Sequence, residues 1–309
     1  MNDKQKSELN IITFRNGLLM GAADAVPGVS GGTIALILGI YSKLIKSLSN
    51  CLIFVKDKFP SKTRDTFISS FTFLFTLGIG MFFSYYIITK FLVGSDDSLG
   101  LLEKKSTAPY VYSFFFGLVL FSIKEPWSLV IRPKYKHYFL FLVGIFVIFL
   151  YANSSLNENA ENKSLLILSG AFALTAMLLP GISGALVLLT LGQYTLIASS
   201  FHDLDFGPLL YFFLGGIIGL ILFVPIMNYA MTNFLDYTMS LLTGLMCGSL
   251  ITLWPWKENY EVEGLSPNLS IIQVLDSFTF FSLFLAVFCF SLGAVASFML
   301  KFFEQKTDL

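Results

Sequence analysis

The sequence predicts an all-α, polytopic membrane protein made of two inverted-topology repeats. Each repeat is expected to hold one re-entrant broken-helix hairpin and three transmembrane helices. The 309 residues are 55% hydrophobic and only 13% charged, whereas a soluble domain carries about 25% charged residues. Apolar runs long enough to span a bilayer recur along the chain. Two further apolar regions are interrupted by Pro-Gly, and their sequences match each other.

The composition also excludes several classes of protein. Basic and acidic residues are equal in number, 20 of each, so we expect no nucleic-acid partner, which would require a surplus of Lys and Arg. The two histidines, His137 and His202, lie at the edge of the apolar segments or outside them. We therefore expect no metal site in the membrane core and no resident cofactor.

The first repeat is predicted to cover residues 1–157. It begins with a hairpin over residues 12–48 that is broken at Pro27-Gly28, and each half is expected to be too short to cross the bilayer. The three apolar runs that follow predict transmembrane helices over 67–93, 109–123 and 138–151.

The second repeat is predicted to cover residues 158–309 in the same order. Its hairpin over residues 165–197 is broken at Pro180-Gly181. The apolar runs after it predict transmembrane helices over 209–231, 239–254 and 278–303.

The two breaks carry the evidence for an internal repeat. PGVSGGTIALILGIY at residues 27–41 and PGISGALVLLTLGQY at residues 180–194 share eight of fifteen positions. A hairpin that enters and leaves on one side adds no crossing, so each repeat crosses three times. An odd number of crossings places the second repeat upside down relative to the first.

The positive charges predict an orientation for this topology. Fifteen of the 20 Lys and Arg residues fall on the side of the N-terminus, which places both termini in the cytoplasm. The five on the other side are Lys90, Lys104, Lys105, Lys163 and Lys257.

Irregular backbone at membrane depth must be satisfied by protein or must line a cavity. We therefore expect the two breaks to meet near the midplane, with backbone N–H groups, hydroxyls and the positive ends of short helices directed at an anion such as phosphate. The candidate substrate-binding residues are Arg15, Asp24, Pro27, Gly28, Ser30, Gly31, Gly32, Thr33, Pro180, Gly181, Ser183 and Gly184.

The charged candidates have two interpretations each. Asp24 is the only acid inside an apolar stretch, and such a group either carries a proton or contacts substrate, or it only caps the helix that follows. Arg15 either acts on an anionic substrate or anchors the helix at the interface. Their counterparts 153 residues later are Leu168 and Met177, so the ionisable groups belong to one repeat. The Pro-Gly breaks themselves could be simple kinks packed through small residues.

These motifs resemble the bacterial polyprenyl-phosphate transporter family over nearly the whole chain. The resemblance rests on ADAVPGVSGGTIALILGIY at residues 23–41, FFGL at 115–118, PGISG at 180–184 and GLMCGSLITLWPW at 244–256. It implies a flippase that returns undecaprenyl phosphate from the outer to the inner leaflet of the bacterial cytoplasmic (inner) membrane for cell-envelope synthesis. The second motif has Ala185 where a small polar residue is expected, so a hydroxyl contact is not expected there.

Other functions remain to be weighed against this one. A secondary transporter of a small soluble anion uses the same helix ends but needs an aqueous path. A polyprenyl-pyrophosphate phosphatase would need paired acids and an arginine at one depth, and a G-x-S-G protease would need a base beside its serine. The sequence favours a non-enzymatic carrier. It leaves open whether transport is coupled to protons or to sodium ions. It also leaves open the oligomeric state, for which a homodimer is one option.

Overall fold

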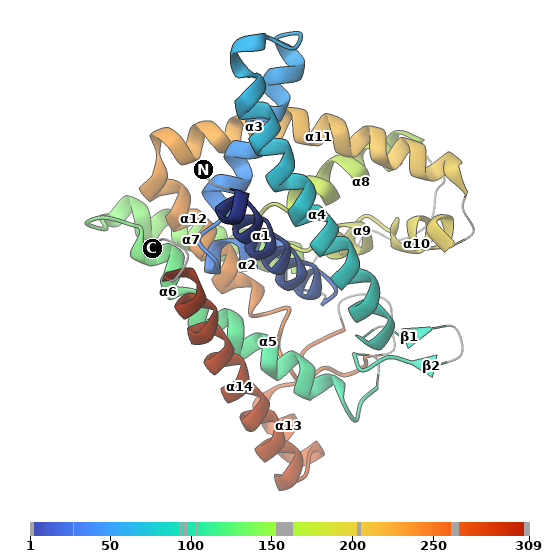
Figure 1. Cartoon of the computed structure of the whole chain (residues 1–309). Helices are drawn as coiled ribbons and strands as arrows, with labels where there is room; N and C mark the ends of the chain where they lie inside the picture. The colour runs from blue at the N-terminus through green and yellow to red at the C-terminus, as the bar shows by residue number, and fades with distance from the viewer. Residues whose placement is uncertain are drawn as a thin grey trace.

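The computed structural model describes residues 3–26, 28–92, 94–95, 98–102, 104–152, 163–202, 205–260 and 266–305. Within these ranges the chain is almost entirely helical (Figure 1), which confirms the predicted all-α class. One short antiparallel hairpin pairs β1 (Gly94–Ser95) with β2 (Ser98–Leu99). The helices are α1 (Asp3–Asp24), α2 (Gly31–Ile37), α3 (Tyr41–Lys56), η1 (Ser61–Thr63), α4 (Arg64–Leu92), α5 (Ala108–Ser122), α6 (Lys124–Ser128), α7 (Tyr135–Ala152), α8 (Lys163–Ala176), α9 (Gly184–Thr190), α10 (Tyr194–His202), α11 (Phe206–Asn233), α12 (Leu235–Ser249), α13 (Ile271–Ser277) and α14 (Phe280–Gln305).

The two breaks in the sequence are breaks in the helices. α1 ends at Asp24 and the seven-residue α2 begins at Gly31, while α8 ends at Ala176 and the seven-residue α9 begins at Gly184. α2 and α3 form a pair bent by 119°. A chain that turns this sharply cannot continue straight across the membrane, so the bent pair has the form of a re-entrant segment.

The backbone conformation repeats with the sequence. Gly28 and Gly181 have φ of 93° and 83°, and Gly39 and Gly192 have φ of 66° and 64°. Both pairs are separated by 153 residues, the spacing of the sequence motif. Gly39 and Gly192 end the two short helices in the left-handed conformation that glycine adopts without strain. The two copies therefore share the conformation of their turns as well as their amino-acid sequence.

The second helix pair of each copy also corresponds. α1 packs along α4, and α8 packs along α11. Gly17 on α1 faces the Leu77 carbonyl so closely that a Cβ would overlap it, and Gly170 on α8 faces the Phe212 carbonyl in the same way. These small residues permit helix axes to approach closely, as in other membrane bundles.

The last helix of each predicted repeat packs on the other repeat. α14 lies along α5, and α7 lies along α12, as the side-by-side course of α5 and α14 in Figure 1 shows. Gly117 on α5 faces the Phe290 carbonyl, and Gly244 on α12 faces the Phe141 carbonyl. The two contacts correspond under exchange of the copies, so the halves are intertwined rather than side by side.

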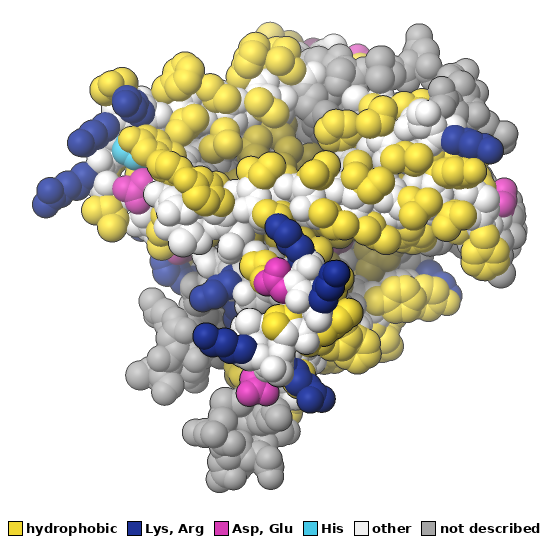
Figure 2. Space-filling model, turned by 90° about the horizontal axis from the view of Figure 1, so that it is seen from above, with side chains coloured by type: hydrophobic (Ala, Val, Ile, Leu, Met, Phe, Trp, Pro, Cys, Tyr) yellow, Lys and Arg dark blue, Asp and Glu magenta, His cyan; other side chains and the backbone are white. Residues whose placement is uncertain are grey.

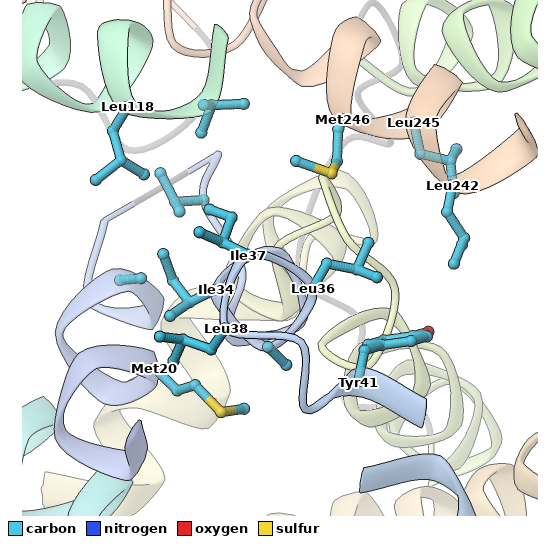
Figure 3. Close-up of a cluster of buried hydrophobic side chains, with 14 of the residues drawn as sticks. Met20, Ile34, Leu36, Ile37, Leu38, Tyr41, Leu118, Leu242, Leu245 and Met246 are labelled. Atoms are coloured by element: carbon cyan, nitrogen blue, oxygen red, sulfur yellow. The ribbon is translucent and has the colours of Figure 1, made fainter. Parts of the chain in front are cut away.

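The short helix α2 lies at the centre of the core. All seven of its residues are buried. Its apolar side chains, among them Ile34 and Ile37, lie among Met20 from α1, Leu118 from α5 and Met246 from α12 (Figure 3). Burial on every side explains why a seven-residue helix is stable here, since a helix of this length is not stable alone in water.

Two predictions about element lengths are wrong. The first half of the hairpin is predicted to start at residue 12, but α1 already begins at Asp3 and has 22 residues, about 33 Å at 1.5 Å per residue. The polar residues before Ile12 continue the helix instead of preceding it. The second half of the hairpin is also longer than predicted. It was expected to end at residue 48, but α3 continues to Lys56.

The six predicted spanning segments all hold helices, but not six full spans. By length and apolar composition, the described helices that can cross a bilayer unaided are Ser61–Leu92, Phe206–Asn233 and Phe280–Lys301. α5 and α12 have 15 residues each, about 22 Å. α12 ends at Ser249 because the next turn is tightened: the Thr252 N–H donates to the Ser249 carbonyl at 3.0 Å. Because the sequence stays largely apolar up to residue 254, it predicts a continuous helix and gives no sign of this turn.

The outer surface suits a lipid environment. Large apolar side chains are exposed on the long helices, with Phe82 at 75%, Ile226 at 67% and Phe280 at 86%. Figure 2 shows Lys and Arg side chains gathered on the face seen from above, beside a broad hydrophobic area. That face is the end of the molecule where α3 leads into α4 in Figure 1.

Candidate translocation site

The two breaks are in direct contact. Ser30 Oγ donates to the Leu179 carbonyl at 2.9 Å, and the Gly181 N–H donates to Thr33 Oγ1 at 3.0 Å. A Cβ on Gly32 would lie 2.8 Å from the Leu178 carbonyl oxygen. Residues about 150 positions apart in sequence thus form one buried site, which we call the paired tips: residues 24–26 and 28–33 with residues 177–184.

Asp24 is the charged group of the first tip. One carboxylate oxygen accepts the Gly31 N–H, so Asp24 caps the N-terminus of α2. A Cβ on Gly31 would lie 2.6 Å from the other carboxylate oxygen, and glycine is therefore required for the carboxylate to sit there. Asp24 is partly exposed while its neighbours Ala23 and Ala25 are buried.

The second tip has the same shape without the charge. Met177 occupies the position of Asp24, and a Cβ on Gly184 would lie 2.6 Å from its Cγ. Ser183 is buried at 4% exposure, and its side chain makes no cap hydrogen bond, in contrast to Ser30. The paired tips are therefore symmetric in backbone and asymmetric in chemistry.

Several donors that the sequence assigns to an anion are taken up by the protein. The Gly31 N–H is used by Asp24, the Gly181 N–H by Thr33, and the Thr33 N–H by the Ser30 carbonyl at 2.9 Å. Ser30 Oγ accepts the same Thr33 N–H at 3.3 Å. The bonds donated by Gly31 and Thr33 lie within the first tip, and the bond donated by Gly181 joins the two tips, so an anion that used these donors would first have to displace their present partners.

The first tip packs on the turn after α12, and the second tip packs on α12 itself. A Cβ on Gly28 would lie 2.6 Å from Thr252 Oγ1, and a Cβ on Gly181 would lie 2.5 Å from the Leu245 carbonyl oxygen. Pro180 is buried, and Pro27 lies outside the described residues. Close backbone contact, together with positive φ, explains why glycine follows proline in both motifs.

Arg15 is not brought to Asp24. It lies nine residues earlier on the continuous helix α1, about 13 Å along the axis and half a turn around it. Its Nη2 donates to the Asn16 amide oxygen at 3.2 Å. The helix α1 therefore holds the two charged side chains on opposite faces.

Lys257 is a charged residue near the tips that sequence reasoning missed. It is only 6% exposed, and its ammonium donates to the carbonyl of Thr252, the residue that packs on Gly28. In the sequence Lys257 was counted only as one of the charges outside the cytoplasm. Its place directly after Trp-Pro-Trp was the available signal, since bulky neighbours can bury a loop residue.

Thr33→Val should test the contact between the tips. Valine has the shape of threonine but cannot accept the Gly181 N–H, so a buried donor loses its partner at a cost of about 1–3 kcal/mol. We expect thermal unfolding in detergent to shift to lower temperature for Thr33→Val and to remain near wild type for Thr33→Ser. Thr190→Val is the matched control, because Thr190 Oγ1 donates to the Leu186 carbonyl within its own helix. Equal shifts for Thr33→Val and Thr190→Val would contradict the contact.

Comparisons with known proteins agree on one family. Residues 20–269 match the model of a family described as undecaprenyl phosphate translocase-like. A polyprenyl-phosphate transporter of Vibrio cholerae serotype O1 (strain ATCC 39315 / El Tor Inaba N16961) is 33% identical over 267 residues, 84% of this chain and 83% of the relative. A polyprenyl-phosphate transporter of Staphylococcus aureus (strain NCTC 8325 / PS 47) is 33% identical over 265 residues, 79% of this chain and 86% of the relative. No solved structure gives a significant match.

Proposed function

This chain belongs to the undecaprenyl phosphate translocase-like family, and from that premise we propose that it moves a polyprenyl phosphate between the leaflets of a membrane. The single observation that carries the proposal beyond family membership is the meeting of two broken helices at the buried paired tips. Broken helices that meet inside a bundle are the usual form of a substrate site in secondary transporters. The protein acts as a carrier and not as an enzyme.

The substrate class sets two physical demands. A phosphate head group needs polar partners across the hydrocarbon, because an unpaired charge at the bilayer centre costs at least about 2.5–3.5 kcal/mol. The polyprenyl tail needs a site that opens sideways to lipid. The polar tips in the core and the exposed apolar faces of α4, α11 and α14 match these two demands.

The proposed mechanism is alternating access by two inverted repeats. The equal spacing of the turns and the corresponding helix pairs support an approximate two-fold axis through the tips. Because the tips donate to each other in this structure, we assign it to a closed state of the transport cycle. Opening toward either leaflet would separate the tips and free the Thr33 hydroxyl and the Gly181 N–H for the phosphate.

We propose an orientation with both termini in the cytoplasm of a bacterial cell and the chain in its cytoplasmic membrane. The excess of Lys and Arg on the side of the N-terminus supports this orientation. The basic face in Figure 2 lies at the end where α3 leads into α4, on the same predicted side. Net transport would then run from the outer to the inner leaflet.

Reconstitution in liposomes tests the proposal. A fluorescent short-chain polyprenyl phosphate is incorporated in both leaflets, and a membrane-impermeant quencher is added outside. We expect the protein to raise the quenchable fraction well above that of empty liposomes, with proton and sodium gradients imposed in turn to identify the coupling ion. A quenchable fraction equal to that of empty liposomes under every gradient would refute the proposed function. Uptake of inorganic phosphate by the same vesicles would favour a soluble-anion transporter instead.

A further inference from the structure

Lys257 is a buried cation that the paired tips do not explain. Its ammonium has two contacts, the Thr252 carbonyl at 3.0 Å and the face of the Tyr112 ring at 5.0 Å from its centre. Among the residues that the structure describes, no carboxylate lies within ion-pair distance of it, and the one ion pair shown joins Lys301 to Glu125. A carbonyl and an aromatic face compensate a buried ammonium only in part.

The loop that carries Lys257 is held firmly in place. The Lys257 N–H donates to the Tyr260 hydroxyl at 3.0 Å, and that hydroxyl donates to the Pro255 carbonyl at 2.6 Å. On the other side of the loop, the Trp254 indole N–H donates to the Leu269 carbonyl at 3.0 Å. The ammonium is therefore positioned by its surroundings and is not a mobile surface side chain.

The position of Lys257 relates it to the first tip. The Thr252 carbonyl receives the ammonium, while the Thr252 side chain lies where a Cβ on Gly28 would be 2.6 Å away. Thr252 therefore contacts both the Lys257 ammonium and Gly28 at the first break. In the predicted topology it lies on the face opposite the N-terminus, the face from which the lipid would enter.

We propose that Lys257 forms the cationic part of a binding site for a phosphate monoester, between Tyr112, Tyr260 and the first tip, which receives the head group before the tips separate. This inference rests on the proposed function and identifies its entry site. The ammonium supplies charge-assisted hydrogen bonds to the phosphate oxygens, and the aromatic side chains exclude water around them. The corresponding Pro-Trp of the first repeat, Pro126-Trp127, is followed by Ser128 and not by a cation, so the entry site is expected on one face only.

The titration of Lys257 provides a signature of this role. Burial lowers the pKa of Lys257 from 10.5 to about 8. The titratable groups that face it are Tyr112 and Tyr260, and burial raises the pKa of Tyr260 to about 12. A phosphate monoester loses its second proton near pH 6, so its charge is nearly constant from pH 7 to 9. Binding that depends on Lys257 must therefore weaken across this interval as the free lysine loses its proton.

Binding of farnesyl phosphate to the purified full-length protein in nanodiscs tests the proposal. Fluorescence of the tryptophans reports binding, and farnesol serves as the uncharged probe. We expect Lys257→Met to weaken the binding of farnesyl phosphate at least about tenfold and to leave the binding of farnesol unchanged. Lys257→Arg should bind within a few-fold of wild type at pH 7 and should lose the decline toward pH 9, because arginine keeps its charge. Lys104→Met is the matched control, since Lys104 is exposed on the same predicted face.

Thermal unfolding separates this role from a purely structural one. If Lys257 forms a ligand site, Lys257→Met removes a buried charge that is compensated only in part, and the unfolding temperature without ligand should stay the same or rise. A lower unfolding temperature with unchanged affinity would make Lys257 a structural cap of the Thr252 carbonyl and overturn the proposal. Competition by inorganic phosphate at equal concentration would support the site and assign it to free phosphate. Wild-type transport with no flipping defect in Lys257→Met would refute this inference alone, whereas absence of flipping by the wild type would refute the proposed function.

Discussion

Asp24→Asn is expected to abolish net lipid translocation while the protein stays folded. The asparagine amide oxygen can still accept the Gly31 N–H, and asparagine and aspartate are nearly equivalent as helix caps. The substitution therefore keeps the geometry of the first tip and removes only the charge and the ability to exchange a proton. The liposome assay should give a flipping rate indistinguishable from empty vesicles, with the unfolding temperature within a few degrees of wild type.

Two controls make the Asp24 result decisive. Asp205→Asn applies the same chemical change to a carboxylate that caps α11 by accepting the Gly207 N–H at 3.0 Å, far from the tips in sequence, and it should leave flipping unchanged. Asp24→Ala removes both cap and charge and should also lower stability by about 1 kcal/mol. Wild-type flipping by Asp24→Asn would reduce Asp24 to a cap and remove it from the transport mechanism.

Gly181→Ala is expected to have the largest effect on folding of any single methyl group added at the site. At φ of 83° a side chain is strained, which costs about 1–2 kcal/mol. The new Cβ would lie 2.5 Å from the Leu245 carbonyl oxygen, where the obstacle is backbone and cannot rotate away, adding about 1–3 kcal/mol. The sum, about 2–5 kcal/mol, should appear as a large fall in unfolding temperature in detergent and in the yield of folded protein.

Gly78→Ala is the matched control for this substitution. Gly78 lies within α4, and nothing lies within 4 Å of a Cβ placed there. Alanine is the better helix former by about 1 kcal/mol, so this variant should be as stable as wild type or more stable. Equal stability of Gly181→Ala and wild type would show that the break is not held in the conformation described here.

The sequence was sufficient for the parts of the fold that depend on local signals. Pro-Gly after an apolar run marked both breaks, and Gly39 and Gly192 marked where the short helices end. The meeting of the breaks followed from a general requirement, that polar backbone in a membrane must find partners. No such requirement fixes which donor pairs with which acceptor, so the hydrogen bond from Gly181 to Thr33 could not be predicted.

The errors come from features that depend on tertiary structure. The largely apolar sequence of α12 continues through Leu253, and only the hydrogen bonds of the turn at Ser249 show that the helix has ended. Lys257 resembles an ordinary loop charge in the sequence, and its burial under Tyr112 depends on a helix more than a hundred residues earlier. Composition and periodicity carry no information about such contacts.

The exchange of the last helices between the two halves has a consequence for biosynthesis. α7 enters the membrane before its partner α12 has been made, and the face of α5 that carries Gly117 waits for α14, the last helix of the chain. Proteins made on ribosomes usually fold domain by domain from the N-terminus, but here neither half can complete its packing while translation continues. A chain that terminates before Phe280 leaves α5 uncovered, so the folded carrier forms only after synthesis has reached its final helix.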